Sequence, residues 1–348
     1  MQLKSKLKSI ILALLLMITL KTRGQDYIYS QFFNAPVYLN PALNGEFKGT
    51  FRANLIYRNQ WSAMSGDLNY MTASADYQFP SMPGAVGIMF NSSTEGTAYL
   101  KKNNIAGIYS YSVGSEDFTA SFGIQAGLTN RKLDFSKLVF SDQLDPRLGY
   151  EGSPSAAEAP YNNNKYFFDA GAGVNIVFKN AMLGASFMHL NKPDESFTGS
   201  RVYTPVRTAV HASYRYALDR NAIDDEDGSF LIPSVVYYKQ AEATSMAAGM
   251  QFKYRGVNAG AWFRTNGKNQ SDAFVFSLIF DIFTNSYRNQ KLRVGVSHDA
   301  TTNKLNYSNT SGTSELSVGF ETGAPREGIW RLKMLRLLLV GSKLFLRP

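Results

Sequence analysis

The side chains that could do chemistry are few and scattered along the 348 residues. The three histidines, His189, His211 and His298, are far apart and lack the spacing of metal ligands. Ser297 and Asp299 flank His298, but successive residues of a strand point to opposite faces, so the three cannot form a catalytic triad by themselves. We therefore expect no catalytic residue, no metal ligand and no cofactor site, and a protein that is not an enzyme.

Two further polar groups each allow two interpretations. The acidic run from Asp224 to Gly228 lacks the rest of an EF-hand pattern, so it is either a solvated turn or a divalent-ion site. Arg58, Gln60 and Trp61 follow one another at the end of a predicted strand. Tryptophan commonly anchors a membrane protein at the lipid interface, and Trp and Arg are also favoured at binding hot spots.

The elements that position these groups are strands with one apolar and one polar face. From Phe118 to Leu128 the apolar residues occupy alternate positions, which is the period of a β-strand. From Val206 to Tyr216 the alternation returns, and Arg207, His211 and Arg215 share the minor face. Arginines on one face do not suit a dry core between two sheets. They suit a wall with lipid on one side and water on the other.

The pattern repeats often enough to predict a fold. The even number of segments, the 24 Phe and 20 Tyr, and the absence of cysteine all fit an all-β protein, a single transmembrane β-barrel of about 14 antiparallel strands of the outer-membrane type. The predicted strands are Thr50–Arg58, Leu68–Phe79, Gly84–Asn91, Asn103–Val113, Asp117–Leu128, Tyr166–Phe178, Ala181–His189, Val206–Ala217, Ser229–Lys239, Thr244–Tyr254, Val257–Arg264, Ala273–Phe283, Leu292–Asp299 and Thr313–Thr322.

Connection lengths offer a second test of the barrel. They should alternate between short inner turns and long outer loops, of which Thr129–Lys165 is the longest. Two connections break the rule: Leu218–Gly228 is long for an inner turn, and Gln240–Ala243 is short for an outer loop. A missed strand near Ala217 would invert every connection after it.

The two ends of the chain differ from its body. Residues 1–24 combine a basic start with a short apolar run, as in a secretory signal peptide, and cleavage before Gln25 is expected. Residues 25–49 are predicted to be an N-terminal periplasmic segment, residues 50–323 the barrel and residues 324–348 a basic, apolar tail. Most of the +9 formal charge lies in the signal and the tail, so the nearly neutral body does not predict nucleic-acid binding.

Short motifs in a fixed order resemble a known family. The chain is similar to the PorP/SprF outer-membrane proteins of the type IX secretion system of Bacteroidetes, from about Gln25 to Thr322. The matching segments are Ser30-Gln31-Phe32, Asn40-Pro41-Ala42 with Gly45, Arg58 with Gln60-Trp61, Asp142-Gln143 with Asp145-Pro146, Ile232-Pro233-Ser234, Gly260 to Arg264, Val294 to Thr302, and Glu315-Leu316. The chain departs from the family pattern at His298, where an aromatic residue is usual, and in its tail.

The resemblance implies a function that the strand pattern alone does not. It implies a barrel that supports the secretion and cell-surface anchoring of a large type IX secreted adhesin, often one used in gliding motility. The expected partners are the C-terminal domain of that adhesin, type IX secretion components and outer-membrane lipid. The candidate partner-binding residues are Arg58, Gln60, Trp61, Asp142, Gln143, Asp145 and Pro146. The alternative is a channel or transporter for a small hydrophobic or nutrient molecule.

Overall fold

A computed structural model describes residues 25–323, apart from residues 81, 97–98, 116, 151, 153, 157–162, 198, 220–227, 268–269 and 286–289. The expected signal segment, the tail after residue 323 and the acidic residues 224–227 lie outside the described residues. None of the helices among the described residues is long and apolar enough to cross a membrane.

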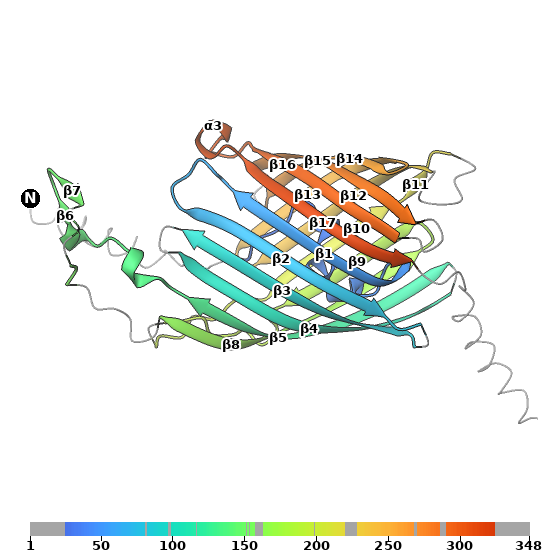
Figure 1. Ribbon diagram of the computed structural model, residues 1–348, viewed down its shortest axis with the longest axis horizontal. Coiled ribbons are helices and arrows are strands. Elements are labelled where there is room, and N and C mark those ends of the chain that lie inside the picture. The colour runs from blue at the N-terminus through green and yellow to red at the C-terminus, as the bar shows by residue number, and fades with distance from the viewer. Residues whose placement is uncertain are drawn as a thin grey trace, which may run out of the picture.

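The fold is a closed antiparallel β-barrel of 14 strands (Figure 1). Each strand pairs with its neighbours along the chain, β1 pairs with β17, and β10 pairs with β12 to complete the ring. The strands are β1 (Gly49–Gln60), β2 (Asp67–Gln78), β3 (Gly84–Gly96), β4 (Leu100–Gly114), β5 (Phe118–Lys132), β8 (Asn164–Phe178), β9 (Ala181–Met188), β10 (Arg207–Tyr214), β12 (Ser229–Gln240), β13 (Ala243–Tyr254), β14 (Val257–Asn266), β15 (Gln270–Asn285), β16 (Gln290–Thr301) and β17 (Thr313–Gly323).

All 14 predicted strands are confirmed, with ends shifted by a few residues. Alternate burial along each strand explains why the pattern could be recognised. On β5, Phe122 is 54% exposed on the outer face, whereas its neighbour Ser121 is fully buried in the lumen. Phe118, Phe252, Tyr254, Phe274, Phe276, Leu278 and Phe280 also lie on the outer face. An outward apolar belt around a closed barrel is the architecture of an outer-membrane protein.

The connections confirm the strand count. The end carrying the long connections, called the outer end here, holds residues 61–66, 133–163, 189–206 and 302–312 between strands. The opposite, inner end holds short turns such as Lys179–Asn180. No strand was missed among the described residues near Ala217: β11 ends at Ala217, β12 begins at Ser229, and residues 220–227 between them lie outside the described residues. The predicted strand at this point is interrupted at Arg215 and continues as the short β11 (Tyr216–Ala217).

The longest outer connection carries short elements of its own. They are η3 (Phe135–Lys137), η4 (Ser141–Gln143), and the two-residue strands β6 (Leu144–Asp145) and β7 (Gly149–Tyr150). This hairpin lies well beyond the ends of β5 and β8 (Figure 1). On the opposite side of the same end, α3 (Tyr307–Thr310) lies in the connection between β16 and β17.

Residues 25–48 lie inside the barrel, and we call them the plug. The expectation of a periplasmic segment here is wrong, because most side chains from Tyr29 to Asn44 are buried by the barrel wall. Polar residues on the inner faces of the strands hydrogen-bond to this segment, as described below. The sequence alone suggested a wall facing water, whereas much of that polar face contacts the plug.

The lipid face yields a testable prediction. Phe276→Arg, near the middle of β15, should lower the free energy of unfolding by about 2–4 kcal/mol, because an arginine must enter lipid. Gln251→Arg faces the lumen on β13, where it is half-buried, and should cost less than about 1 kcal/mol. Urea titration of the barrel in liposomes measures both. Ser121 is unsuitable as the lumen control, because its hydroxyl is buried and donates to Glu46 of the plug at 2.7 Å. Equal costs for Phe276→Arg and Gln251→Arg would contradict the assignment of the faces.

Candidate functional site: the plug and the outer mouth

The plug folds as three short helical turns, and two of them begin with a proline. Its elements are η1 (Phe32–Asn34), α2 (Pro36–Leu39) and η2 (Pro41–Leu43). Pro36 and Pro41 each begin a turn, where a missing backbone N–H costs nothing and the fixed φ is suitable. The Asn40 side chain caps η2 by accepting a hydrogen bond from the Ala42 N–H at 2.9 Å. The compact shape of these turns lets the segment fit within the lumen.

One side of the plug approaches the barrel backbone closely. The Asn40 amide donates to the carbonyl oxygen of Val174 at 3.0 Å and lies 3.2 Å from the His211 ring nitrogen. Glycines make this approach feasible: a Cβ at Gly173 would overlap the Asn40 side chain, and one at Gly123 would overlap the Pro41 backbone. The Asn-Pro-Ala motif is therefore a docking element within the protein.

The inner end of the plug is held by a buried ion pair. Arg52 Nη2 lies 2.6 Å from Asp76 Oδ2, and the same nitrogen donates to the Leu43 carbonyl oxygen at 2.9 Å. Asp76 also accepts from the Gly45 N–H at 2.8 Å. The pair thus joins β1 and β2 to the last turn of the plug.

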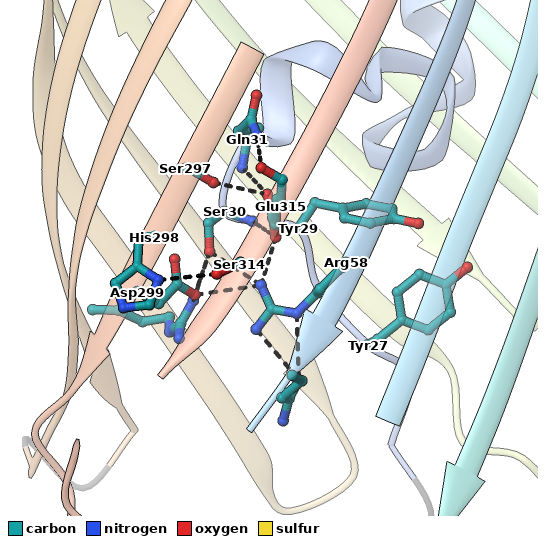
Figure 2. A network of polar contacts seen from close by, with 12 residues as sticks. Tyr27, Tyr29, Ser30, Gln31, Arg58, Ser297, His298, Asp299, Ser314 and Glu315 are labelled. Carbon is teal, nitrogen blue, oxygen red and sulfur yellow. Dashed lines mark hydrogen bonds and ion pairs between the residues drawn. The ribbon is translucent and has the colours of Figure 1, made fainter. Parts of the chain in front are cut away.

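The strongest polar contacts gather around Ser30 and Gln31 (Figure 2). Both carboxylate oxygens of Glu315 accept backbone N–H bonds from these two residues, each at 2.8 Å. The Ser30 hydroxyl donates to Asp299 Oδ2 at 2.6 Å. Arg58 Nη1 lies 2.5 Å from Glu315 and 3.3 Å from Asp299. We call Ser30, Gln31, Arg58, Asp299, Glu315 and Arg264 the plug anchor.

Arg264 completes the charge balance of the plug anchor. Its guanidinium lies 2.9 Å from Asp299 and 2.7 Å from Asp272. Arg58, Asp299 and Glu315 are each at most 3% exposed. Charges buried to this degree are costly unless they are paired and hydrogen-bonded. Asp299 Oδ2 is bonded in this way, whereas Asp299 Oδ1 has no hydrogen-bond partner among the described residues. The backbone N–H groups of the plug supply part of that bonding, so the charges in the wall depend on the plug.

A second set of contacts holds the plug at the outer end. Asp26 lies 2.5 Å from His189 Nε2, and Asp169 lies 2.9 Å from His189 Nδ1. Burial alone would lower the pKa of His189, but the two carboxylates raise it to about 9. Burial alone would raise the pKa of Asp26, but the positive charges of His189, Lys102 and Arg207 hold it well below its usual value. The pair is therefore charged at neutral pH.

We call the contacts of His189 with Asp26 and Asp169 the outer tether. Two cavities lie beside it at the outer mouth. One, of about 310 Å³, is lined by plug residues from Gln25 to Ile28 and by Arg58, Gln60 and Trp61. We call it the outer cleft. The other, of about 180 Å³, lies on the side of Lys102, Glu195 and His189. Ionic and aromatic groups from both plug and wall are thus accessible at the surface that faces outward.

The structure separates the predicted partner-binding residues into two groups. Arg58, Gln60 and Trp61 meet at the outer cleft, with Gln60 Oε1 accepting from Arg58 at 3.3 Å. The second group lies in the hairpin extension of the long loop. There Asp142 accepts from the Ala156 N–H, Asp145 accepts from the N–H groups of Arg147 and Leu148, Gln143 caps η4, and Pro146 follows Asp145.

The roles of some residues could not be recognised from the sequence. His189 was predicted as the end of a strand, and its partner Asp26 is 163 positions away, so no local spacing connects them. Ser30, Gln31 and Glu315 were noticed only as motif residues. Ser297 and Asp299 are buried on the lumen side, whereas His298 between them is half-buried on the other face of the strand.

Taken together, these features define a class: an outer-membrane β-barrel whose own N-terminal segment fills its lumen. The family comparison is more specific. Residues 21–320 match the family described as "Type IX secretion system membrane protein PorP/SprF", and the chain belongs to this family. The family is a group of secretion-system membrane barrels and not a class of enzymes, and membership implies association with type IX secretion components. Comparison with curated proteins gives no significant match.

Several solved structures are similar to this chain at low sequence identity. The outer membrane protein Omp33 of Acinetobacter baumannii is 10% identical, with a TM-score of 0.41, over 78% of this chain and 98% of that one. The CymD monoaromatic hydrocarbon channel is 12% identical, with a TM-score of 0.45, over 87% and 95%. A FadL homologue of Pseudomonas aeruginosa is 10% identical, with a TM-score of 0.41, over 81% and 92%. The hydrocarbon specificity in such names belongs to those proteins.

The plug anchor predicts a large effect of one substitution. Arg58→Ala should lower the free energy of unfolding by about 3–5 kcal/mol, because it leaves Glu315 without its closest cation in a buried site. Lys165→Ala removes a partly exposed pair with Asp194 and should cost less than about 1 kcal/mol. Urea unfolding in liposomes compares the two. Similar costs would show that the plug anchor contributes no more than a surface ion pair.

The outer tether predicts a dependence on pH. Because the pKa of His189 is raised, the stabilisation that its ion pairs give to the plug is fully present below pH 6.5 and is lost as the pH rises to about 9. Because the pKa of Asp26 is lowered, protonation of Asp26 weakens the outer tether only below about pH 3.8. Chymotrypsin cleavage after Tyr27, relative to cleavage after the exposed Tyr150, should therefore increase between pH 6.5 and pH 9. In His189→Gln the ratio should no longer change over this range. An unchanged ratio in the natural protein would contradict the tether.

Proposed function

We propose that this barrel holds a large type IX secreted adhesin at the cell surface and supports its secretion, in the context of gliding motility. The observation that carries the proposal is the plug. A lumen occupied by a segment bonded to buried charges is suited to a rigid platform, since the interior is already filled. Rigid walls with outward loops commonly carry recognition.

Two outward features supply the surface for such a partner. The outer cleft offers Gln60 and Trp61, and Trp is enriched at binding hot spots. Arg58 is only 3% exposed behind them and donates to Gln60 Oε1 at 3.3 Å. The extension of residues 133–163 carries the second motif, with Leu148 and Tyr150 exposed on its hairpin. We propose that the C-terminal domain of the adhesin contacts both, with Asp142, Gln143, Asp145 and Pro146 shaping the hairpin that it meets.

The second candidate, a channel for a small hydrophobic or nutrient molecule, has a specific observation in its favour. Cavities occur at both ends of the plug. Between them lies a cavity of only about 10 Å³, which shares Trp262 with the cavity at the inner end and Arg264 with the outer cleft. A space of this size holds about one water molecule, so it argues against passage of a nutrient with the plug in place. The anchoring role therefore has the stronger support.

The decisive experiment replaces residues 134–162 by a short flexible linker in cells. β5 and β8 remain paired beside the linker, so the barrel should keep its resistance to heat and detergent. The adhesin should move from the cell surface to the medium, whereas other type IX substrates should be secreted as before. Trp61→Ala should weaken surface retention through the outer cleft.

A matched control separates loop length from loop chemistry. It keeps the natural loop length but changes Asp142, Gln143, Asp145 and Pro146 to serine and glycine, and it should also release the adhesin. Retention of the adhesin by the linker variant would exclude the loop as the contact. Failure of all type IX secretion in a deletion strain would instead place the protein in the general export machinery.

A further inference from the structure

The second cavity of the outer mouth lies between the plug and the inner faces of β3, β4, β5 and β8. We call it the side cavity. Its volume is about 180 Å³, and its rim includes Val202 and Tyr203 of the connection after β9, which are 55% and 52% exposed. Cavities that hold drug-sized molecules usually measure about 300–1,000 Å³. The side cavity is therefore suited to a smaller ligand that enters from the outside.

The charged side chains of the side cavity are balanced in number. Four carboxylates line it together with four cations, which are Lys102, Arg131, Arg207 and the protonated His189. Glu195 lies 2.8 Å from Lys102 and 3.7 Å from Arg131, and Asp26 lies 2.5 Å from His189. The residues of the two bordering connections that lie outside the described part are uncharged, namely Thr97, Ala98 and Thr198. The lining as a whole therefore favours a neutral ligand.

Two acceptors in this lining have bonding capacity to spare. The Glu95 carboxylate is attracted by Lys102, but that ammonium is paired with Glu195 at 2.8 Å. Gln125 is 8% exposed, and its Oε1 has no hydrogen-bond partner among the residues that the structure describes. Buried polar atoms without a partner are uncommon and costly. A half-turn of the side-chain amide exchanges Oε1 and Nε2, so Gln125 can present either atom to a ligand.

Donors are supplied by a row of amides on neighbouring strands. Asn91 Nδ2 donates to Asn104 Oδ1 at 3.2 Å, and Asn104 Nδ2 donates to Thr129 Oγ1 at 2.8 Å. All three side chains line the side cavity. Each amide nitrogen carries two N–H bonds, and this row uses one of them. Donors and acceptors close together suit a ligand whose hydroxyl groups both donate and accept.

An aromatic ring at the rim adds a flat surface. Tyr203 pairs with Asp194 in the connection after β9, and its ring contacts no other aromatic ring among the described residues. Tyr27 differs, because its ring stacks on those of Tyr38 and Tyr70 with centroids 5.1 and 4.3 Å away. The C–H bonds of a sugar ring carry a partial positive charge, and the face of an aromatic ring is negative. Tyr203 therefore offers a surface on which a sugar ring can pack.

We propose that the side cavity binds one neutral hexose residue from outside the cell. The sugar ring packs on Tyr203, and its hydroxyl groups donate to Glu95 and Gln125. The same hydroxyl groups accept from the amides of Asn91 and Asn104. A free sugar and the end of a glycan chain share this chemistry. The site is separate from the proposed adhesin contacts, so sugar binding by the purified barrel and adhesin retention in cells test different statements.

Saturation-transfer difference NMR provides a direct assay. The barrel in nanodiscs is titrated separately with the methyl glycosides of glucose, mannose and galactose. At least one of them should give a signal that saturates and that empty nanodiscs do not give. The uronic acid of the same sugar should bind about tenfold more weakly, because Glu95 repels its carboxylate. A disaccharide ending in the same sugar distinguishes the sources: equal affinity identifies the end of a glycan, and loss of binding identifies a free sugar.

Paired variants test the assignment of residues. Gln125→Leu should weaken binding by about tenfold. It should leave the resistance to heat in detergent unchanged, because Oε1 has no hydrogen bond to lose. Tyr203→Ala should also weaken binding, whereas Tyr203→Phe keeps the ring and should bind as the parent does. Tyr216→Ala, which removes an exposed tyrosine at the inner end, is the matched control and should leave the affinity unchanged.

Several outcomes would overturn the proposal. One is the absence of a saturating signal with all three glycosides. Equal affinity for the glycoside and its uronic acid would also overturn it. So would unchanged affinity in both Gln125→Leu and Tyr203→Ala when these variants keep their resistance to heat. Loss of adhesin retention in cells with intact sugar binding would contradict neither proposal, so the two can fail separately.

Discussion

The rest of this structure depends on the burial of Arg58, Asp299 and Glu315 within a membrane barrel. Charges in such a place are costly unless ion pairs and hydrogen bonds replace the lost water. Arg264 and the other wall residues supply some of these partners, and the backbone N–H groups of Ser30 and Gln31 supply the remainder around Glu315. The wall and the plug are therefore one energetic unit. Without the plug, Glu315 and Asp299 would lose the hydrogen bonds that Ser30 and Gln31 donate to them.

This dependence gives the family motifs a physical meaning. The segments with Ser30-Gln31, Arg58, Arg264, Asp299 and Glu315 are separated by up to 285 positions, yet their polar atoms form one network. Asn40 and Gly45 dock the following turn of the plug. The family match over residues 21–320 thus includes the residues that close the lumen. Surface recognition can be left to the long loop and to Trp61 of the outer cleft, which do not belong to the plug anchor, whereas Arg58 and Arg264 of the same cleft do.

The fold could be predicted from the sequence to a greater extent than the site. Strand positions were recoverable because lipid outside and polar groups inside impose a period of two, as on β5 from Phe118 to Lys132. The position of the plug could not be predicted, because its short turns have no regular period of apolar residues. In addition, the polar face of the wall could have faced either water or a polar segment of the chain. The contact between Asp26 and His189 joins residues that no spacing connects. Arg58 was predicted as a partner-binding residue, and its burial shows a structural contribution that its type alone did not reveal.

The order of the chain has a consequence for biogenesis. Gln25 lies at the outer mouth and β1 begins at the inner end, so the plug runs the length of the lumen before the first strand. The acceptors that hold it, Asp299 and Glu315, belong to β16 and β17, the last strands to be synthesised. The plug must therefore wait for these strands before it can be fixed in place. We therefore expect pairing of β1 with β17 and binding of the plug to occur together, late in folding, so that the closing barrel encloses residues 25–48.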